Sequence, residues 1–275
     1  MAFFSVLIPF HNREDMVRRA IASVCRQTDQ DFELVIVDDG STDGSVAAAR
    51  DASAHISERT KLIKLKTNLG IPGARNVSLE AASGQIAAFL DSDDVCHPRF
   101  LSTVRRAFEA APNFIFAFTN YLSLGPNSAG PVIQMAAPEA VKDPIEAMLT
   151  KPFIHTMSCF AAPLADMRAL GGFNTRLKRF SDLDMYVRLL AGNGPGNKLA
   201  WKQRPFIVVP HVAVLKDIHL KDRPLQSYVA AWEANKRMFL DEVFAYPFMA
   251  KKQRLRRKCE RHLDEGQRQF FANFT

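Results

Sequence analysis

The sequence has no apolar run that approaches the ~18–20 residues needed to span a bilayer. Its first residues, MAFFSVLIPFHN, also lack the basic leader and the small-residue cleavage site of a secretory signal. We therefore expect this stretch to be the first strand of a folded domain and the protein to be cytoplasmic. The composition, 47% hydrophobic and 24% charged, is ordinary for a soluble globular protein.

Closely spaced cysteines and glycine-rich dinucleotide motifs are also absent. The four cysteines are Cys25, Cys96, Cys159 and Cys259, and no two of them form a CxxC pair. This scatter argues against a zinc site and fits reduced thiols in the cytosol. No GxGxxG sequence follows an expected strand, which argues against a dinucleotide-dependent oxidoreductase.

The net positive charge is small over most of the chain and is concentrated near its end. The net charge is +7, and eight basic and three acidic residues lie between Lys251 and Arg268. The rest of the chain is therefore nearly neutral. A nucleic-acid-binding protein would usually carry a basic face on its folded body, so we expect no nucleic acid among the partners.

An acidic turn follows one strongly apolar stretch. Five apolar residues, Ile86 to Leu90, are followed by three carboxylates within four positions, Asp91, Asp93 and Asp94. The apolar run is typical of a short buried strand. Carboxylates this close repel one another unless a cation sits among them, and oxygen ligands suit Mg²⁺ or Mn²⁺. A solvated turn is the structural alternative, because Asp and Ser are common loop residues.

Strand-like and helical patterns alternate along the first part of the chain. The expected strands cover 3–10, 32–37, 61–65, 86–90 and 114–121, and the expected helices cover 14–26, 45–55, 70–82 and 98–111. This alternation predicts an α/β fold in which helices cover both faces of a mostly parallel sheet. Further on we expect a loop over 123–138, a strand over 206–215, and helices over 181–190, 225–244 and 249–269.

A second acidic turn, at Asp38 and Asp39, follows the expected strand 32–37. Ligands of open α/β sheets bind beyond the carboxyl ends of the strands, so the two acidic turns are expected to converge on one ligand. One turn could accept hydrogen bonds from a ribose or a base, while the other holds a metal on a diphosphate.

Several segments together resemble a known family. The segments SVLIPFHNRE, QTDQDFELVIVDDGSTDGS, NLGIPGARN and FLDSDD follow one another in the order and spacing found in family 2 glycosyltransferases. GGFNTRLKRFSDLDMYVRL and VLKDIH resemble later elements of the same family more loosely. The resemblance covers roughly residues 3 to 220. It implies a GT-A fold, Rossmann-like, and an inverting enzyme that uses a nucleotide-sugar donor.

The resemblance also implies roles for single residues. Donor binding is implied for Pro9, His11, Asn12, Arg13, Asp39, Gly70, Arg75, Asn76, Asp91 and Ser92. Asp39 would contact the base or ribose, and Asp91 the ribose or the metal. The metal, Mn²⁺ or Mg²⁺, would be held by Asp93, Asp91 and His219. The general base falls on Asp182.

The implied reaction moves a sugar from a nucleotide-sugar, most simply a UDP-sugar, to a hydroxyl group of a glycan or lipid-linked acceptor. Two alternatives stay open. A nucleotidyltransferase would need a glycine-rich phosphate loop after the first strand, where this chain has Pro9-Phe10-His11-Asn12. A nucleotide-sugar-binding pseudoenzyme would not need both Asp93 and Asp182.

Three polar residues could have a structural role instead of a role in binding or catalysis. Asp38 could brace a turn or touch the ligand. Asp184 lies two positions from Asp182, on another face of the expected helix, which favours structural pairing. His211 lies in an apolar run and is expected to be a strand or core residue.

We expect two parts in the chain. Residues 1–222 would form the catalytic domain, with a nucleotide-binding half at 1–121 and an acceptor half at 122–222, and residues 223–275 a helical extension. The basic helix near the end could lie on an anionic membrane, placing the protein at the inner face of the membrane. Alternatively, its apolar residues pack on the body or on a second subunit of a homo-oligomer.

Overall fold

The structure is a computed structural model that describes residues 2–124, 131–132, 143–154, 156–194, 197–198, 204–217 and 225–272. Strands and helices alternate from the N-terminus, as the sequence predicts. The first elements are β1 (Phe4–Phe10), α1 (Glu14–Cys25), β2 (Phe32–Asp38), α2 (Ser45–Ser53), β3 (Thr60–Lys64), α3 (Gly70–Ala81), β4 (Ile86–Phe89), β5 (Val95–Cys96) and α4 (Phe100–Ala110).

The second part of the chain adds further strands to the same sheet and a group of helices beside it. Its elements are β6 (Ala117–Leu124), β7 (Pro131–Val132), α5 (Pro144–Thr150), β8 (Phe160–Pro163), α6 (Leu164–Ala169), α7 (Ser181–Ala191), β9 (Asn193–Gly194), β10 (Asn197–Lys198), β11 (Ile207–Asp217), α8 (Leu225–Ala245) and α9 (Gln253–Ala272). The loop expected over 123–138 lies largely outside the described residues.

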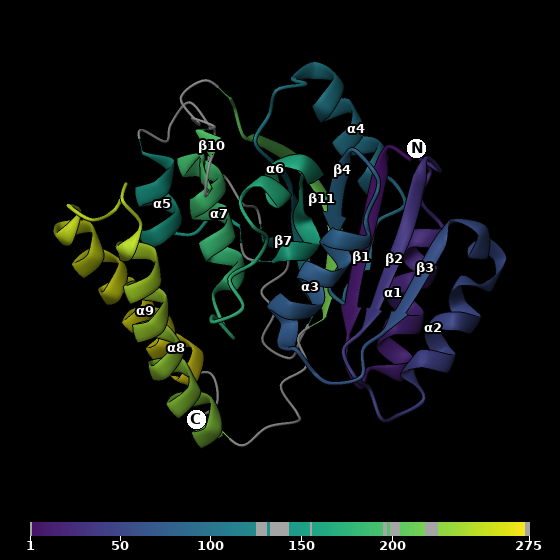
Figure 1. Cartoon of the computed structure of the whole chain (residues 1–275), viewed down its shortest axis with the longest axis horizontal. Coiled ribbons are helices and arrows are strands. Elements are labelled where there is room, and N and C mark those ends of the chain that lie inside the picture. The colour runs from purple at the N-terminus through teal and green to yellow at the C-terminus, as the bar shows by residue number, and fades with distance from the viewer. Residues whose placement is uncertain are drawn as a thin grey trace.

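Nine of the described strands form one sheet with the order β3-β2-β1-β4-β8-β6-β11-β5, in which β7 pairs with β6, and β9 and β10 form a separate two-stranded sheet. The first four strands in this order are parallel to one another. Their carboxyl ends therefore meet at one edge of the sheet, where the two acidic turns follow β2 and β4. The expected α/β fold with a mostly parallel sheet is confirmed (Figure 1).

One strand breaks the simple parallel series. β8 lies between β4 and β6 and runs antiparallel to both. The sequence predicts the strand over 114–121 as the next member of the alternating series, but β6 begins only at Ala117, and β4 pairs with β8 in its place. The pairing places Ala87 and Ala88 opposite Ala162 and Ala161. These side chains are all buried, so small residues allow the layers to pack closely on both faces of the sheet.

The sheet has an apolar core on each face, because successive side chains of a strand point to opposite faces. On one face, Val6 and Ile8 pack with residues of α1, α2 and α4. On the other, Leu7 and Phe89 pack with residues of α3, α5, α6 and α7. Strands that are buried on both faces read as continuous apolar runs, which is why β1, β2 and β4 were predictable.

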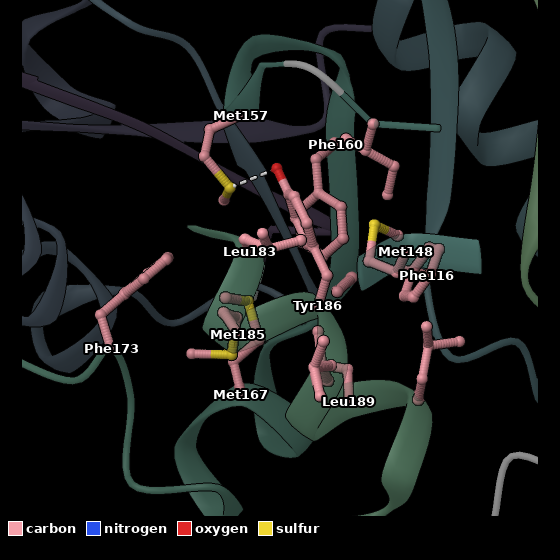
Figure 2. Close-up of a cluster of buried hydrophobic side chains, with 14 of the residues drawn as sticks. Phe116, Met148, Met157, Phe160, Met167, Phe173, Leu183, Met185, Tyr186 and Leu189 are labelled. Carbon is pink, nitrogen blue, oxygen red and sulfur yellow. Dashed lines mark hydrogen bonds between the residues drawn. The ribbon is translucent and has the colours of Figure 1, made fainter. Parts of the chain in front are cut away.

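Helix α7 is fixed by Tyr186, which is fully buried in the second core. Figure 2 shows this side chain among Phe116, Met148 and Phe160, with its hydroxyl directed at Met157. The Tyr186 hydroxyl lies 2.9 Å from the sulfur of Met157. This packing holds α7 against the core, and the first turn of that helix carries Asp182.

The C-terminal helices pack on the same core, at the opposite end of the molecule from β3 (Figure 1). Leu255, Cys259 and Leu263 of α9 are buried against the body. Ion pairs add further contacts: Lys258 of α9 meets Glu146 of α5, and Arg256 meets Asp241 of α8. The apolar residues of this helix therefore pack on the body, which is one of the alternatives that the sequence left open. Among the described helices, none is both long enough and apolar enough to cross a membrane.

Candidate active site

A cavity of about 550 Å³ opens at the edge where the parallel strands end. It brings together residues from the ends of β1, β2 and β4, the start of α3, the segment before α7, and the end of β11. Its lining residues are Pro9, Phe10, His11, Arg13, Asp39, Asn68, Leu69, Gly70, Ile71, Pro72, Ala74, Arg75, Asp91, Ser92, Asp93, Thr175, Lys178 and Lys216. The convergence of the two acidic turns on one cavity agrees with the expectation from the sequence.

Asp91, the first residue of the acidic turn after β4, is paired with a buried arginine. The Arg75 guanidinium lies 2.8 Å from one oxygen of Asp91, and 5.5 Å above the ring of Phe173. Burial opposes the ionisation of Asp91, but Arg75 lowers its pKa below the usual value. Burial likewise disfavours charged Arg75, while Asp91 and then Asp182 raise its pKa. Both groups are therefore charged in the folded protein.

The other two carboxylates of the turn differ from Asp91. Burial and the nearby Asp91 raise the pKa of Asp93. Burial also raises the pKa of Asp94 to about 7, although Lys216 lowers it. Asp94 is fully buried and accepts a hydrogen bond of 2.5 Å from the Ser158 hydroxyl, so it supports the turn from inside. Asp93 is half-buried and lines the cavity, so it can meet a ligand.

The acidic turn fits a divalent cation that is shared with a ligand. In the described part of the chain, no group of three or more His, Cys, Asp or Glu side chains could hold a metal by itself. Mg²⁺ and Mn²⁺, however, are commonly held by one or two carboxylates together with substrate phosphates. Burial disfavours a charged Asp93 beside a charged Asp91, and a cation would relieve this cost. His219, the third expected ligand, lies outside the described residues.

The corner after β1 joins the ends of two strands. His11 and Arg13 line the cavity, as does Pro9. Asn12 has a left-handed backbone, with φ of 51°. Its side-chain oxygen accepts a hydrogen bond from the amide of Thr42, and its own amide donates to the Ser41 hydroxyl. Asn12 therefore braces the two loops and is not among the residues that line the cavity; its direct donor contact stays a prediction.

Asp38 and Asp39, the two carboxylates of the second acidic turn, have different surroundings. Asp38 is buried and accepts a hydrogen bond from the amide of Ser41, so it braces the turn. Asp39 lines the cavity and accepts a 2.7 Å hydrogen bond from the amide of Leu69. The loop before α3 is therefore held against β2. At Gly70, φ is +76°, a conformation that favours glycine.

Asn76 faces a different partner from the one implied by the resemblance. Its side-chain amide donates to the carbonyl of Phe173 and accepts from the amide of the same residue. This double contact holds the Gly171-Gly172-Phe173 segment against α3. Asn76 is absent from the cavity lining, so its role in donor binding also stays a prediction.

Asp182 lies in the first turn of α7, after a strained residue. Phe180 precedes the helix with φ of 61°, a left-handed conformation that is costly for a bulky side chain. Asp182 is half-buried, and its carboxylate accepts a hydrogen bond from the amide of Leu183. It does not line the cavity directly, but its charge acts on Arg75, which does.

Asp184 and His211 have structural surroundings. Asp184 is fully buried, forms an ion pair of 2.8 Å with Arg188, and accepts a 2.8 Å hydrogen bond from the Tyr246 hydroxyl. This agrees with the structural pairing expected for it. His211 lies in β11, where its ring is 5.1 Å from that of His97, and it does not line the cavity.

Several cavity residues were missed from the sequence. Lys178 and Thr175 precede α7 within a segment that resembles the family, but their side chains could not be oriented. Lys216 lies three residues before His219 in the VLKDIH segment, where only the histidine attracted attention. Ser158, which holds Asp94, comes from a segment with no motif at all.

A mainly parallel sheet with two acidic strand ends around one cavity is the architecture of the GT-A glycosyltransferases. Residues 5–164 match the family model described as "Glycosyl transferase family 2". The chain belongs to this family.

Two relatives show how far the similarity extends. EpsE of Bacillus subtilis (strain 168), whose name describes a glycosyltransferase, is 31% identical over 67% of this chain and 65% of its own length. WfgD of Escherichia coli, named UDP-Glc:α-D-GlcNAc-diphosphoundecaprenol β-1,3-glucosyltransferase, is 33% identical over 50% of this chain and 52% of its own length. The chain thus spans about two thirds or less of the curated relatives it matches.

Two solved structures share the fold. TarS 1–349 of S. aureus in complex with UDP has a TM-score of 0.67 and 19% identity, over 93% of this chain and 69% of that one. The mannosyltransferase PcManGT of Pyrobaculum calidifontis, in complex with GDP-Man and Mn²⁺, has a TM-score of 0.62 and 16% identity. That match covers 96% of this chain and 73% of PcManGT. At such identities the likeness shows the fold alone.

Proposed function

We propose that the chain transfers a sugar from a UDP-sugar to a hydroxyl group of a glycan or lipid-linked acceptor, with metal dependence and inversion at the anomeric carbon. The observation that carries this proposal is the single cavity bounded by Asp39 on one side and by Asp91 and Asp93 on the other. A nucleoside diphosphate has matching parts: a base and ribose at one end, and two phosphates that attract a cation at the other.

The nucleoside end is assigned to the ends of β1 and β2. The Asp39 carboxylate can accept hydrogen bonds from the uracil edge or the ribose, while His11 and Arg13 line the same cavity. TarS, which shares the fold, is known in complex with UDP, and this supports a uridine nucleotide. Gly70 and Arg75 also line the cavity, and Arg75 is bound to Asp91 of the acidic turn.

The metal is assigned to Asp93 with Asp91, and His219 is proposed as a further ligand. When bound, a divalent cation supplies positive charge that stabilises the leaving diphosphate. The Mn²⁺ complex of PcManGT supports this choice of cation. The ion pair between Arg75 and Asp91 keeps the Asp91 carboxylate ionised and turned toward α3, which leaves Asp93 as the more accessible ligand.

The general base is assigned to Asp182. An acceptor hydroxyl attacks the anomeric carbon, the bond to the diphosphate oxygen breaks, and the hydroxyl proton passes to the Asp182 carboxylate. Attack opposite to the leaving group inverts the configuration. Such a base contributes ~10²–10⁴-fold to the rate. The rigid core below α7 would hold the carboxylate in place (Figure 2).

The acceptor and the extent of the catalytic unit are also proposals. The name of WfgD describes an acceptor sugar that is linked to diphosphoundecaprenol. This supports a lipid-linked acceptor here. We propose that residues 1–222 carry the catalytic groups, while residues 223–275 complete the core beneath α7.

Nucleotide binding and turnover test this assignment together. We expect UDP to raise the melting temperature of the protein more than GDP does. The full increase should require Mn²⁺. Asp93→Asn should lose the Mn²⁺-dependent part of UDP binding. Asp182→Asn should bind UDP normally yet release UDP from UDP-sugars at least ~100-fold more slowly.

The control variant is Asp51→Asn, which removes an exposed carboxylate on α2. It should behave as the unaltered chain in both measurements. Unchanged metal dependence in Asp93→Asn, or near-normal turnover in Asp182→Asn, would contradict the corresponding assignment. Stronger stabilisation by GDP than by UDP would contradict the proposed donor.

A further inference from the structure

Lys216 is a basic residue at the cavity that neither acidic motif includes. It lies next to the last residue of β11, and the antiparallel pairing places Val214 opposite Cys96 and Leu215 opposite Val95. Continued by one residue, this register puts Lys216 across from Asp94. β11 therefore places the positive charge of Lys216 beside the acidic turn.

The charges around Lys216 differ from those around Arg75. The Arg75 guanidinium is buried and bound to Asp91, at 2.8 Å. Lys216 is half-buried and lines the cavity with Asp91, Ser92 and Asp93. Burial alone would lower the pKa of Lys216, but Asp94, Asp91 and Asp93 raise it above the ordinary value. The ammonium is therefore charged, and the three carboxylates attract it at the cavity where we place the diphosphate.

We propose that Lys216 is a built-in cation of the donor site: its ammonium contacts the donor diphosphate and shares the acidic turn with the divalent metal. The proposal rests on the function proposed above, because it assumes a diphosphate in this cavity. A lysine ammonium is a compact cation with three donors, and it is a common partner of phosphates.

Two consequences follow from a fixed cation beside a metal site. The diphosphate can bind without metal, because Lys216 still offers it a positive charge. The metal binds the empty site less tightly than three carboxylates alone would allow, because like charges repel in a partly buried site. A lysine that only stabilised the fold would change neither quantity in a folded variant.

Binding measurements on Lys216→Met separate these roles. In EDTA, we expect UDP to bind this variant at least ~10-fold more weakly than the unaltered chain, since a charge-assisted hydrogen bond is lost. With saturating Mn²⁺ the difference should shrink. In the absence of nucleotide, Mn²⁺ should bind the variant at least ~10-fold more tightly than it binds the unaltered chain. The electron paramagnetic resonance signal of free Mn²⁺ measures this binding.

Lys216→Arg keeps the charge and should stay close to the unaltered chain. Lys151→Met removes an exposed lysine at the end of α5, which does not line the cavity, and should change nothing. If Lys216→Met does not fold, Lys216→Gln replaces it. Equal UDP affinity in EDTA for the unaltered chain and the neutral variant overturns the proposal. A chain that binds no uridine nucleotide under any condition refutes the proposed donor instead, and the nucleotide-free Mn²⁺ titration still tests Lys216.

Discussion

At the scale of single residues, Asp39 has a structural role and, as we propose, a role in donor binding. Its carboxylate accepts the Leu69 amide and so holds the loop before α3, and it also lines the cavity. The backbone oxygen of Asp39 accepts a further hydrogen bond from the Asn68 side chain. Replacing this residue therefore changes both the loop and the ligand contact, and two substitutions are needed to separate them.

Asp39→Asn and Asp39→Ala should differ in a defined way. The asparagine oxygen can still accept the Leu69 amide, so Asp39→Asn keeps the loop but loses the charge that we propose binds the nucleoside. We expect about tenfold weaker binding of both UDP and free uridine. Asp39→Ala should show at least this loss and a lower melting temperature. Titration calorimetry with both ligands checks the prediction; if only UDP suffers, Asp39 acts on the diphosphate end.

At the scale of elements, the segment before α7 depends on α8. The ring of Phe180 packs 5.3 Å from Trp232 and 5.4 Å from Phe239, both on α8. The amide of Arg179 also donates to the Asn235 side chain, 3.2 Å away. These contacts keep Phe180 in its left-handed conformation, and the next turn carries Asp182. Helix α8 therefore positions the proposed base without touching it.

Two substitutions of Phe180 test this support. Phe180→Ala keeps a side chain in the strained conformation and loses the ring contacts, whereas Phe180→Gly loses the ring but adopts positive φ without strain. We expect both to be destabilised, with the alanine variant about 1 kcal/mol less stable than the glycine variant. UDP binding should be nearly normal and turnover reduced. Equal stability in thermal unfolding would contradict the role of strain.

The sequence predicted those elements whose signals are local. Strands β1, β2 and β4 carry continuous apolar runs, and the acidic turns directly follow two of them. The insertion of β8 between β4 and β6 was not predictable, because it depends on pairing between segments far apart in the chain. The contacts of Ser158 with Asp94 and of Asn76 with Phe173 depend on that same packing.

At the scale of the whole molecule, the C-terminal helices are part of the core. The apolar residues Leu255, Cys259 and Leu263 of α9 face the body, while Arg254, Arg257 and Arg261 are exposed. With the helical period of 3.6 residues, the two sets fall on opposite sides of α9. The body covers this apolar face, so these three residues pack in the core. Contact through the exposed arginines alone stays a prediction.

Removal of α9 should destabilise the fold, whereas reversal of its exposed charges should not. A chain that ends at Phe248 leaves the apolar surface under α9 uncovered, which should cost roughly 5 kcal/mol and lower the melting temperature strongly. Arg254→Glu, Arg257→Glu and Arg261→Glu together should leave the fold intact, because these side chains are exposed.

The same triple variant tests contact with an anionic surface without unfolding the protein. Each arginine near such a surface contributes about 1 kcal/mol, and nearby Glu260 and Glu265 reduce the total. We expect the unaltered chain to sediment with anionic vesicles at low salt and to dissociate at high salt, where the charges are screened. The triple variant should not sediment at either salt concentration. Binding that survives high salt would require apolar insertion by residues other than the buried face of α9, and equal sedimentation of both proteins would exclude the arginines.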